Sequence, residues 1–209
     1  MFFAPSPNVL TAVWKERSQD RDTFKVSFNL IGVPVIGNFI GRAAQIEQME
    51  KHLQPIGEAR RQTTLVLHGL GGIGKTQLAL EFVKRHRDEY SAIFWISGKT
   101  EQTLRQGIAD IAKRIPLENV LDIEGELLEG DKTISVAIRD VSEWLRAKDN
   151  FRWLLILDNI DSQTFTGTQR DVGDSRVVAS QKVDYDIRPY FEPLGQGSIL
   201  ITTRLSYMA

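Results

Sequence analysis

No cysteine occurs in the sequence, so disulfide bonds and thiol chemistry are excluded. Apolar runs long enough to cross a membrane are also missing, and the first residues lack the basic segment and the apolar stretch of a signal peptide. The net charge of −1 gives no general attraction to nucleic acid or to a membrane surface. These absences predict a cytoplasmic protein with neither nucleic acid nor membrane among its partners.

The sequence does contain a regular alternation of apolar runs and helical periodicity within 209 residues, a length that suits one α/β domain. Short apolar runs, typical of buried parallel strands, occur at 64–68, 91–96, 153–158 and 198–202. Apolar residues recur at helical spacing in 43–53, 75–88, 100–115 and 133–148. This alternation predicts a parallel sheet with helices on both faces, whose strands end at one ligand-binding edge.

The most informative stretch runs from residue 68 to residue 80 and fits the pattern G-x-x-x-x-G-K-[S/T] of a phosphate-binding loop. Glycines let backbone N–H groups approach a polyphosphate, and the helix that follows adds its positive dipole end. We expect Lys75 to bind the β- and γ-phosphate oxygens and the Thr76 hydroxyl to ligate Mg²⁺. The residues predicted to contact the nucleotide are Gly69, Leu70, Gly71, Gly72, Ile73, Gly74, Lys75, Thr76 and Gln77. The alternative is a glycine-rich turn that binds nothing.

A second informative stretch is the apolar run 153–157, which ends in Asp158. An apolar strand ending in an acid, downstream of a phosphate loop, is typical of the strand whose carboxylate holds the Mg²⁺ of a P-loop ATPase. Taken alone, the same pattern also suits a plain buried strand. Its place after the loop, with strand and helix units between, favours the metal ligand.

Two further stretches resemble NB-ARC domains, the nucleotide-binding domains of STAND-class P-loop ATPases, which include NLR receptors. The first is the tetrapeptide Phe39-Ile40-Gly41-Arg42. The second is the stretch 197–204, which we expect to be a buried strand ending in Arg204. The resemblance implies that Ile40 and Arg42 lie against the adenine and that Arg204 senses the γ-phosphate with its planar, permanently charged donor group. Core packing of Ile40 and solvent-exposed positions for the two arginines are the alternatives.

The same resemblance implies a three-layer P-loop NTPase fold with the strand order second-third-first-fourth-fifth. Residues 35–209 would be the nucleotide-binding subdomain and residues 1–34 an N-terminal leader. The chain would be truncated before the helical and winged-helix subdomains, which are its expected partners in the full-length protein. We also expect the last strand to have an unpaired edge that favours self-association.

In function, the resemblance implies an ATP/ADP-binding switch in which slow Mg²⁺-dependent hydrolysis controls homo-oligomerisation and immune or cell-death signalling. The catalytic residues would be Lys75, Asp158 and Arg204. Asn159 stands where plant relatives carry a second acid, and an amide cannot act as a base, so hydrolysis is expected to be slow, with Asp161 as a substitute base. The pair Asp158-Asn159 is similar to that of fungal members. The alternatives are a turnover P-loop ATPase or phosphotransferase, and a scaffold without hydrolysis.

Minor features complete the predictions. Phe24, Val26 and Phe28 alternate as in a short strand. His52 and His86 are expected on the surface, because neither has a carboxylate or a second histidine at metal-ligand spacing. His68, at the end of the strand before the loop, is expected to be packed and neutral.

Overall fold

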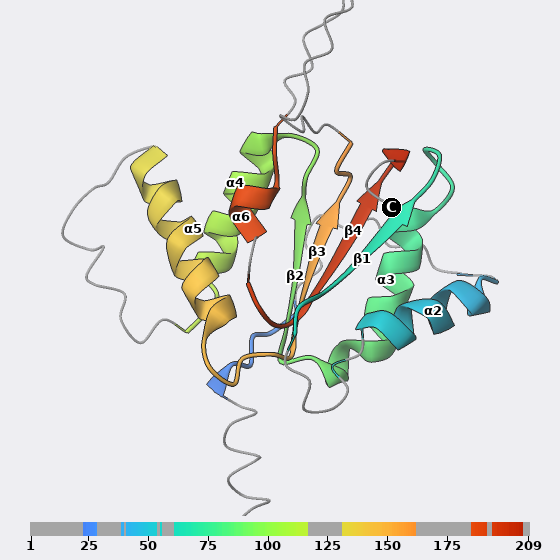
Figure 1. The fold of residues 1–209 in the computed structure, drawn as a ribbon, viewed down its shortest axis with the longest axis horizontal. Helices are drawn as coiled ribbons and strands as arrows, with labels where there is room; N and C mark the ends of the chain where they lie inside the picture. The colour runs from blue at the N-terminus through green and yellow to red at the C-terminus, as the bar shows by residue number, and fades with distance from the viewer. Residues whose placement is uncertain are drawn as a thin grey trace, which may run out of the picture.

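The computed structural model describes residues 23–28, 39, 41–53, 55, 61–116, 131–161, 185–191 and 194–206. Its centre is one parallel four-stranded sheet with helices on both sides (Figure 1). The strands are β1 (Thr63–His68), β2 (Ala92–Ser97), β3 (Trp153–Asp158) and β4 (Ser198–Thr203). The predicted three-layer α/β architecture is confirmed. Within the described residues, none of the helices is both long and apolar enough to span a membrane.

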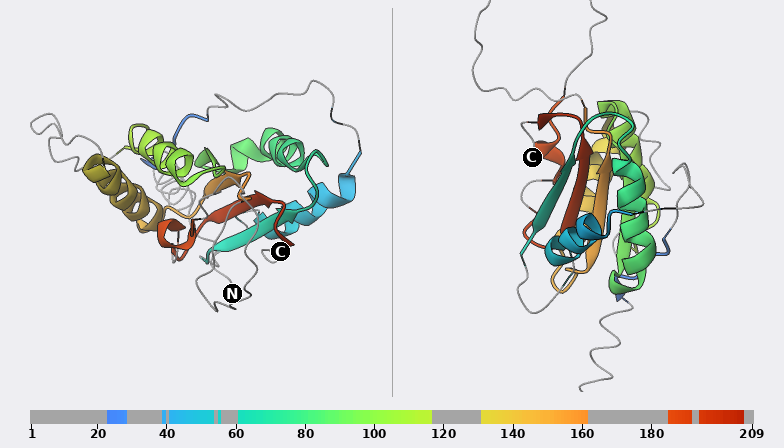
Figure 2. Two further views of the ribbon diagram at one scale, coloured as in Figure 1. Left: turned by 90° about the horizontal axis from the view of Figure 1, so that it is seen from above. Right: turned by 90° about the vertical axis from the view of Figure 1, so that its right-hand side faces the viewer.

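Two groups of helices cover the two faces of the sheet (Figure 2). One face carries α2 (Ala43–Leu53) and α3 (Lys75–His86), which a short 3-10 turn, η1 (Arg87–Glu89), extends. The other face carries α4 (Glu101–Ala112), α5 (Asp131–Arg146) and the short α6 (Arg188–Phe191). Side chains of β3 alternate between the two cores, because successive residues of a strand point to opposite faces. This two-sided burial explains why β3 is an unbroken apolar run.

The order of the strands is β1-β4-β3-β2, so the predicted order second-third-first-fourth-fifth is wrong. β4 lies between β1 and β3 and pairs with both, and its residues are all buried, as are those of β3. β1 is partly exposed along its length, and within the described part of the chain it has a strand neighbour on one side only. The predicted unpaired edge of the last strand is therefore also wrong, because β4 is central.

Helix α4 packs closely on β2 along the predicted apolar stripe, with Leu104, Ile108 and Ile111 all buried. Its start is fixed by Thr100, whose side chain accepts the Thr103 backbone N–H in a capping box. A Cβ at Gly107 would stand only 2.6 Å from a side-chain carbon of the facing strand. The small residue therefore sets how near the helix approaches the sheet.

Residues 23–28 contain no strand, so the strand predicted from the alternating Phe24, Val26 and Phe28 is wrong. Residues 25–28 have no regular secondary structure, and the Val26 N–H donates to the Ser91 carbonyl at 2.9 Å without starting a ladder. Its apolar side chains nevertheless pack on the core, and the Phe24 ring meets Trp144 edge-on at 5.9 Å. The alternating apolar side chains of this segment therefore reflect packing on the core and not pairing with a neighbouring strand.

The three histidines differ from one another in their surroundings. His52 is exposed, as predicted, and His68 is exposed rather than packed. His86 is buried, which corrects the predicted surface position. Its Nδ1 lies 2.8 Å from a Glu89 carboxylate oxygen and its Nε2 lies 3.0 Å from one of Glu50, so the ring bridges α2 and the end of α3.

Candidate nucleotide-binding site

The carboxyl ends of the four strands form one edge of the sheet, and the glycine-rich loop 69–74 connects β1 to α3 at this edge (Figure 1). Gly72 and Gly74 have φ angles of 77° and 90°, a left-handed conformation that other residues adopt at a cost in free energy. Gly74 is also the N-cap of α3, so the loop turns directly into the first helical turn, whose N–H groups point toward the loop. The backbone geometry therefore fits an anion such as a phosphate.

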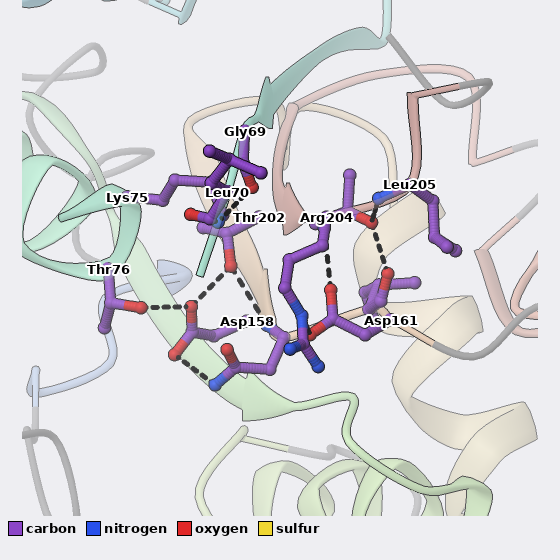
Figure 3. Close-up of polar contacts among 12 residues, drawn as sticks. Gly69, Leu70, Lys75, Thr76, Asp158, Asp161, Thr202, Arg204 and Leu205 are labelled. Atoms are coloured by element: carbon purple, nitrogen blue, oxygen red, sulfur yellow. Dashed lines mark hydrogen bonds and ion pairs between the residues drawn. The ribbon is translucent and has the colours of Figure 1, made fainter. Parts of the chain in front are cut away.

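Lys75 is the first residue of α3, and its side chain folds back over the loop. The ammonium Nζ donates to the Gly69 carbonyl at 2.7 Å and to the Leu70 carbonyl at 3.0 Å (Figure 3). An ammonium has three donor hydrogens, so these carbonyls hold the charge beside the loop with two of them. Phosphate oxygens bound in the loop would therefore lie next to the positively charged Lys75 ammonium.

Thr76 and Asp158, which are 82 positions apart in sequence, lie in direct contact under the loop. The Thr76 hydroxyl donates to Oδ1 of Asp158 at 2.9 Å, and the carboxylate is buried at the end of β3 (Figure 3). One hydroxyl and one carboxylate suit Mg²⁺, which usually keeps several waters and takes its other ligands from phosphates. The residues present therefore fit the predicted metal site.

Thr202 is a site residue that the sequence analysis overlooked. Its hydroxyl donates to Oδ1 of Asp158 at 2.5 Å and accepts the backbone N–H of Asn159 at 2.9 Å. The side chain is fully buried on β4 and so fixes the Asp158 carboxylate from the strand next to it. The two threonines directly before Arg204 in the sequence were the available sign of this contact, but the resemblance predicted a function for the arginine alone.

Thr202→Val is expected to weaken Mg²⁺-dependent nucleotide binding about 5- to 10-fold, because the nearly isosteric valine removes a charge-assisted hydrogen bond to Asp158. Mg²⁺ titration at a fixed concentration of fluorescent ATP measures this change. Thr64→Val, on the exposed side of β1, is the matched control. An unchanged Mg²⁺ dependence in the Thr202 variant would show that Asp158 needs no support from β4.

Asn159 follows Asp158 in a left-handed conformation, with φ at 64°. Its side-chain amide nitrogen donates to Oδ2 of Asp158 at 3.2 Å, so the amide faces the carboxylate as a donor. Asn159 stands at the position where a second acid would serve as the general base, and its amide provides no basic group there.

Arg204 lies beside the loop, although its first partner is an acid. Its backbone N–H donates to Oδ1 of Asp161 at 2.7 Å, and its Nε donates to Oδ2 at 2.6 Å (Figure 3). A Cβ built on Gly71 would lie 3.6 Å from Cδ of Arg204 and 3.8 Å from its Nη1. The structure thus places the guanidinium next to the phosphate loop, with Asp161 on its other side.

Arg42, just before α2, lies beside the end of the phosphate loop. Its Nη2 donates to the Ile73 carbonyl and is 3.7 Å from the position of a Cβ on Gly74. The arginine therefore ties the start of α2 to the phosphate loop. Leu70 and Ile73, two apolar residues of this loop, are exposed. Ile40, predicted beside the adenine, lies outside the described residues.

Tyr185 anchors the segment before α6 to the end of β2. Its hydroxyl donates to the Gly98 carbonyl at 2.5 Å, and the Gly98 N–H donates to the Asp158 carbonyl at 2.7 Å. Burial raises the pKa of the Tyr185 phenol above its ordinary value, so this group stays a neutral donor across the physiological range. The backbone of Asp158 is thus held from β2 as its side chain is held from β4.

A parallel sheet, a glycine loop that opens a helix, and a threonine and an aspartate meeting beneath it define a P-loop NTPase. Residues 38–172 match the AAA ATPase domain family, and the chain belongs to this family. The match and the relative described next confirm the predicted NB-ARC type of P-loop nucleotide-binding domain. Membership implies binding of a nucleotide, usually with Mg²⁺.

The chain is 29% identical over 168 residues to a nucleotide-binding leucine-rich repeat (NLR)-like protein of Hyaloscypha variabilis. This alignment covers 79% of the chain and 16% of the relative, so the chain spans less than a fifth of that protein's length. Among solved structures, it is similar to Cdc6p from Pyrobaculum aerophilum, with a TM-score of 0.46 and 14% identity, over 84% of this chain and 42% of that one.

Proposed function

We propose that the chain is the ATP/ADP-binding switch module of an NLR-like protein, with slow Mg²⁺-dependent hydrolysis. In the whole protein, this switch would control homo-oligomerisation and immune or cell-death signalling through helical and winged-helix partner domains. The observation that carries the nucleotide-binding part is the contact of Thr76 with Asp158 under a loop that Lys75 covers. The likeness to an NLR-like protein supports the signalling part.

Each site residue has a separate task in this proposal. Backbone N–H groups of the loop 69–74 and of the first turn of α3 bind phosphate oxygens, and Lys75 neutralises part of their charge. Thr76 and Asp158 would hold Mg²⁺, which would supply positive charge to screen the phosphates. Arg204 contacts the γ-phosphate, the group that distinguishes ATP from ADP.

Slow hydrolysis is supported by the residues at the two positions where a general base would be expected, 159 and 161. Asn159 is an amide, and its nitrogen donates to Asp158. Asp161 is a carboxylate, but both of its oxygens accept hydrogen bonds from Arg204. The amide has no basic lone pair, and the Asp161 carboxylate is already paired with a guanidinium. This arrangement favours a nucleotide-bound switch over a turnover ATPase or a phosphotransferase.

Titration of the purified chain with fluorescent ADP and ATP, each with Mg²⁺, tests nucleotide binding. Lys75→Ala is expected to weaken both affinities roughly 10- to 100-fold, because it removes charge-assisted hydrogen bonds to the phosphates. The control is Lys84→Ala, which removes an exposed lysine from the far end of the same helix. Equal affinities for wild type and Lys75→Ala would refute the site, and rapid multiple-turnover release of phosphate would refute slow hydrolysis.

A further inference from the structure

We propose that Asp161 is a positioning residue for Arg204, which aims the guanidinium at the loop and thereby sets the preference for ATP over ADP. The inference rests on the proposed function, in which Arg204 contacts the γ-phosphate. It adds a second residue to that contact, one that touches no nucleotide itself.

The first observation is the form of the contact between Asp161 and Arg204. One carboxylate oxygen accepts the backbone N–H of Arg204 at 2.7 Å and the other accepts its Nε at 2.6 Å. The same acid therefore fixes the main chain at the end of β4 and the direction in which the side chain leaves it. Because one oxygen of the acid is tied to the Arg204 main chain, the other is in place to restrict the rotamers of the arginine side chain.

The second observation is which part of the guanidinium Asp161 leaves available. The acid takes Nε, and Nη1 lies at the loop, 3.8 Å from the position of a Cβ on Gly71. The Arg204 side chain is 56% exposed, whereas that of Asp161 is 13% exposed. The Nε end of the guanidinium is thus held by a covered acid, and its Nη1 lies beside the phosphate loop. A planar guanidinium can serve both partners because its donors point in fixed, different directions.

The third observation is that Asp161 is itself held rigidly. The Ile160 N–H donates to the Thr202 carbonyl at 2.9 Å, and the Thr203 hydroxyl donates to the Ile160 carbonyl at 2.5 Å. The same Thr203 hydroxyl accepts the Leu205 N–H at 3.0 Å. The turn after β3 and the end of β4 are therefore joined at Ile160, directly before the ion pair, and Leu205 is tied back to the same Thr203 hydroxyl. Such support keeps the arginine oriented before nucleotide arrives.

Affinities for Mg²⁺-ATP and Mg²⁺-ADP, measured with Asp161→Ala, Asp161→Asn, Arg204→Ala and the double variant Asp161→Ala/Arg204→Ala, test the inference. Asp161→Ala is expected to weaken ATP binding about 5- to 10-fold and to change ADP binding less than about 2-fold. Asp161→Asn, which keeps an oxygen for the backbone N–H, is expected to fall between wild type and Asp161→Ala. The double variant is expected to bind ATP no more weakly than Arg204→Ala, because the two residues act as a unit.

Asp186→Ala is a matched control, because Asp186 also accepts both the backbone N–H and Nε of an arginine, Arg188, outside the site. Its ratio of ATP to ADP affinity should equal that of wild type. An equal loss for both nucleotides in Asp161→Ala, a gain in ATP affinity, or additive losses in the double variant would overturn the inference while leaving nucleotide binding intact. Failure of the wild-type chain to bind either nucleotide would instead refute the proposed function.

Discussion

Asp158→Ala is expected to abolish the Mg²⁺ dependence of nucleotide binding and to weaken Mg²⁺-ATP binding roughly 100-fold. The carboxylate is the acidic group that contacts Thr76, and its loss removes the charge that would hold the metal. It also leaves the hydroxyls of Thr76 and Thr202 without this acceptor. Titration with fluorescent ATP in Mg²⁺ and in EDTA measures the effect, since the two curves should coincide for the variant.

Asp158→Asn and Asp88→Ala are the companion variants for this experiment. The amide of Asp158→Asn would retain the shape and one oxygen, so the fold should be kept while the charge is lost. Asp88 is an exposed acid on the turn after α3, and its removal should leave both curves of wild type unchanged. If Asp158→Asn still requires Mg²⁺ as wild type does, another acid holds the metal and the assignment is wrong.

Gly197→Ala is expected to lower the free energy of unfolding by about 3–5 kcal/mol. This figure is the sum of two costs: that of a left-handed backbone at a residue with a Cβ, and that of overpacking in the core. Gly197 precedes β4 with φ at 77°, and a Cβ there would stand 2.2 Å from the indole of Trp153. Trp153 is fully buried and donates its ring N–H to the Leu145 carbonyl, so the ring has no room to move away. Urea unfolding followed by circular dichroism measures the loss.

Gly195 provides the matched control because its φ of 79° is almost the same, yet nothing lies within 4 Å of a Cβ placed there. Gly195→Ala is expected to cost about 1–2 kcal/mol, which is the conformational part alone. Similar losses in the two variants would mean that the contact with the indole contributes nothing. Nucleotide affinity per folded molecule should be unchanged in both, since neither residue belongs to the loop.

The four strands of the sheet and the helices α2 to α5 were predictable from the sequence, because they appear as short apolar runs and as apolar stripes at helical spacing, whereas the short α6 has no such pattern. β3 and β4 differ from β1 in burial, but all three appear in the sequence as short apolar runs. Strand order depends on which strands lie between others, and local composition does not contain that information. The order was therefore taken from resemblance, and it was wrong.

The candidate site shows the same division between local and long-range information. The loop and Asp158 were predictable because each lies within one contiguous motif. The supporting contacts were not predictable, since Thr202 reaches Asp158 across 44 positions and Asp161 reaches Arg204 across 43.

The buried position of His86 was missed for a related reason, because Glu50 meets it only through the packing of α2 on α3. Glu89, three positions along the chain, was the available signal.

The central place of β4 has a consequence for the order in which the chain folds. β1 and β3 are joined in the sheet only through β4 within the described residues, and Thr63 meets Ser198 across 135 positions. Until β4 inserts, the strand before the loop and the strand that ends in Asp158 have no common neighbour in the sheet, and closing such a distant contact is entropically slow. A nascent chain that has emerged only as far as β3 would therefore hold every residue of the phosphate loop and still have no assembled binding site.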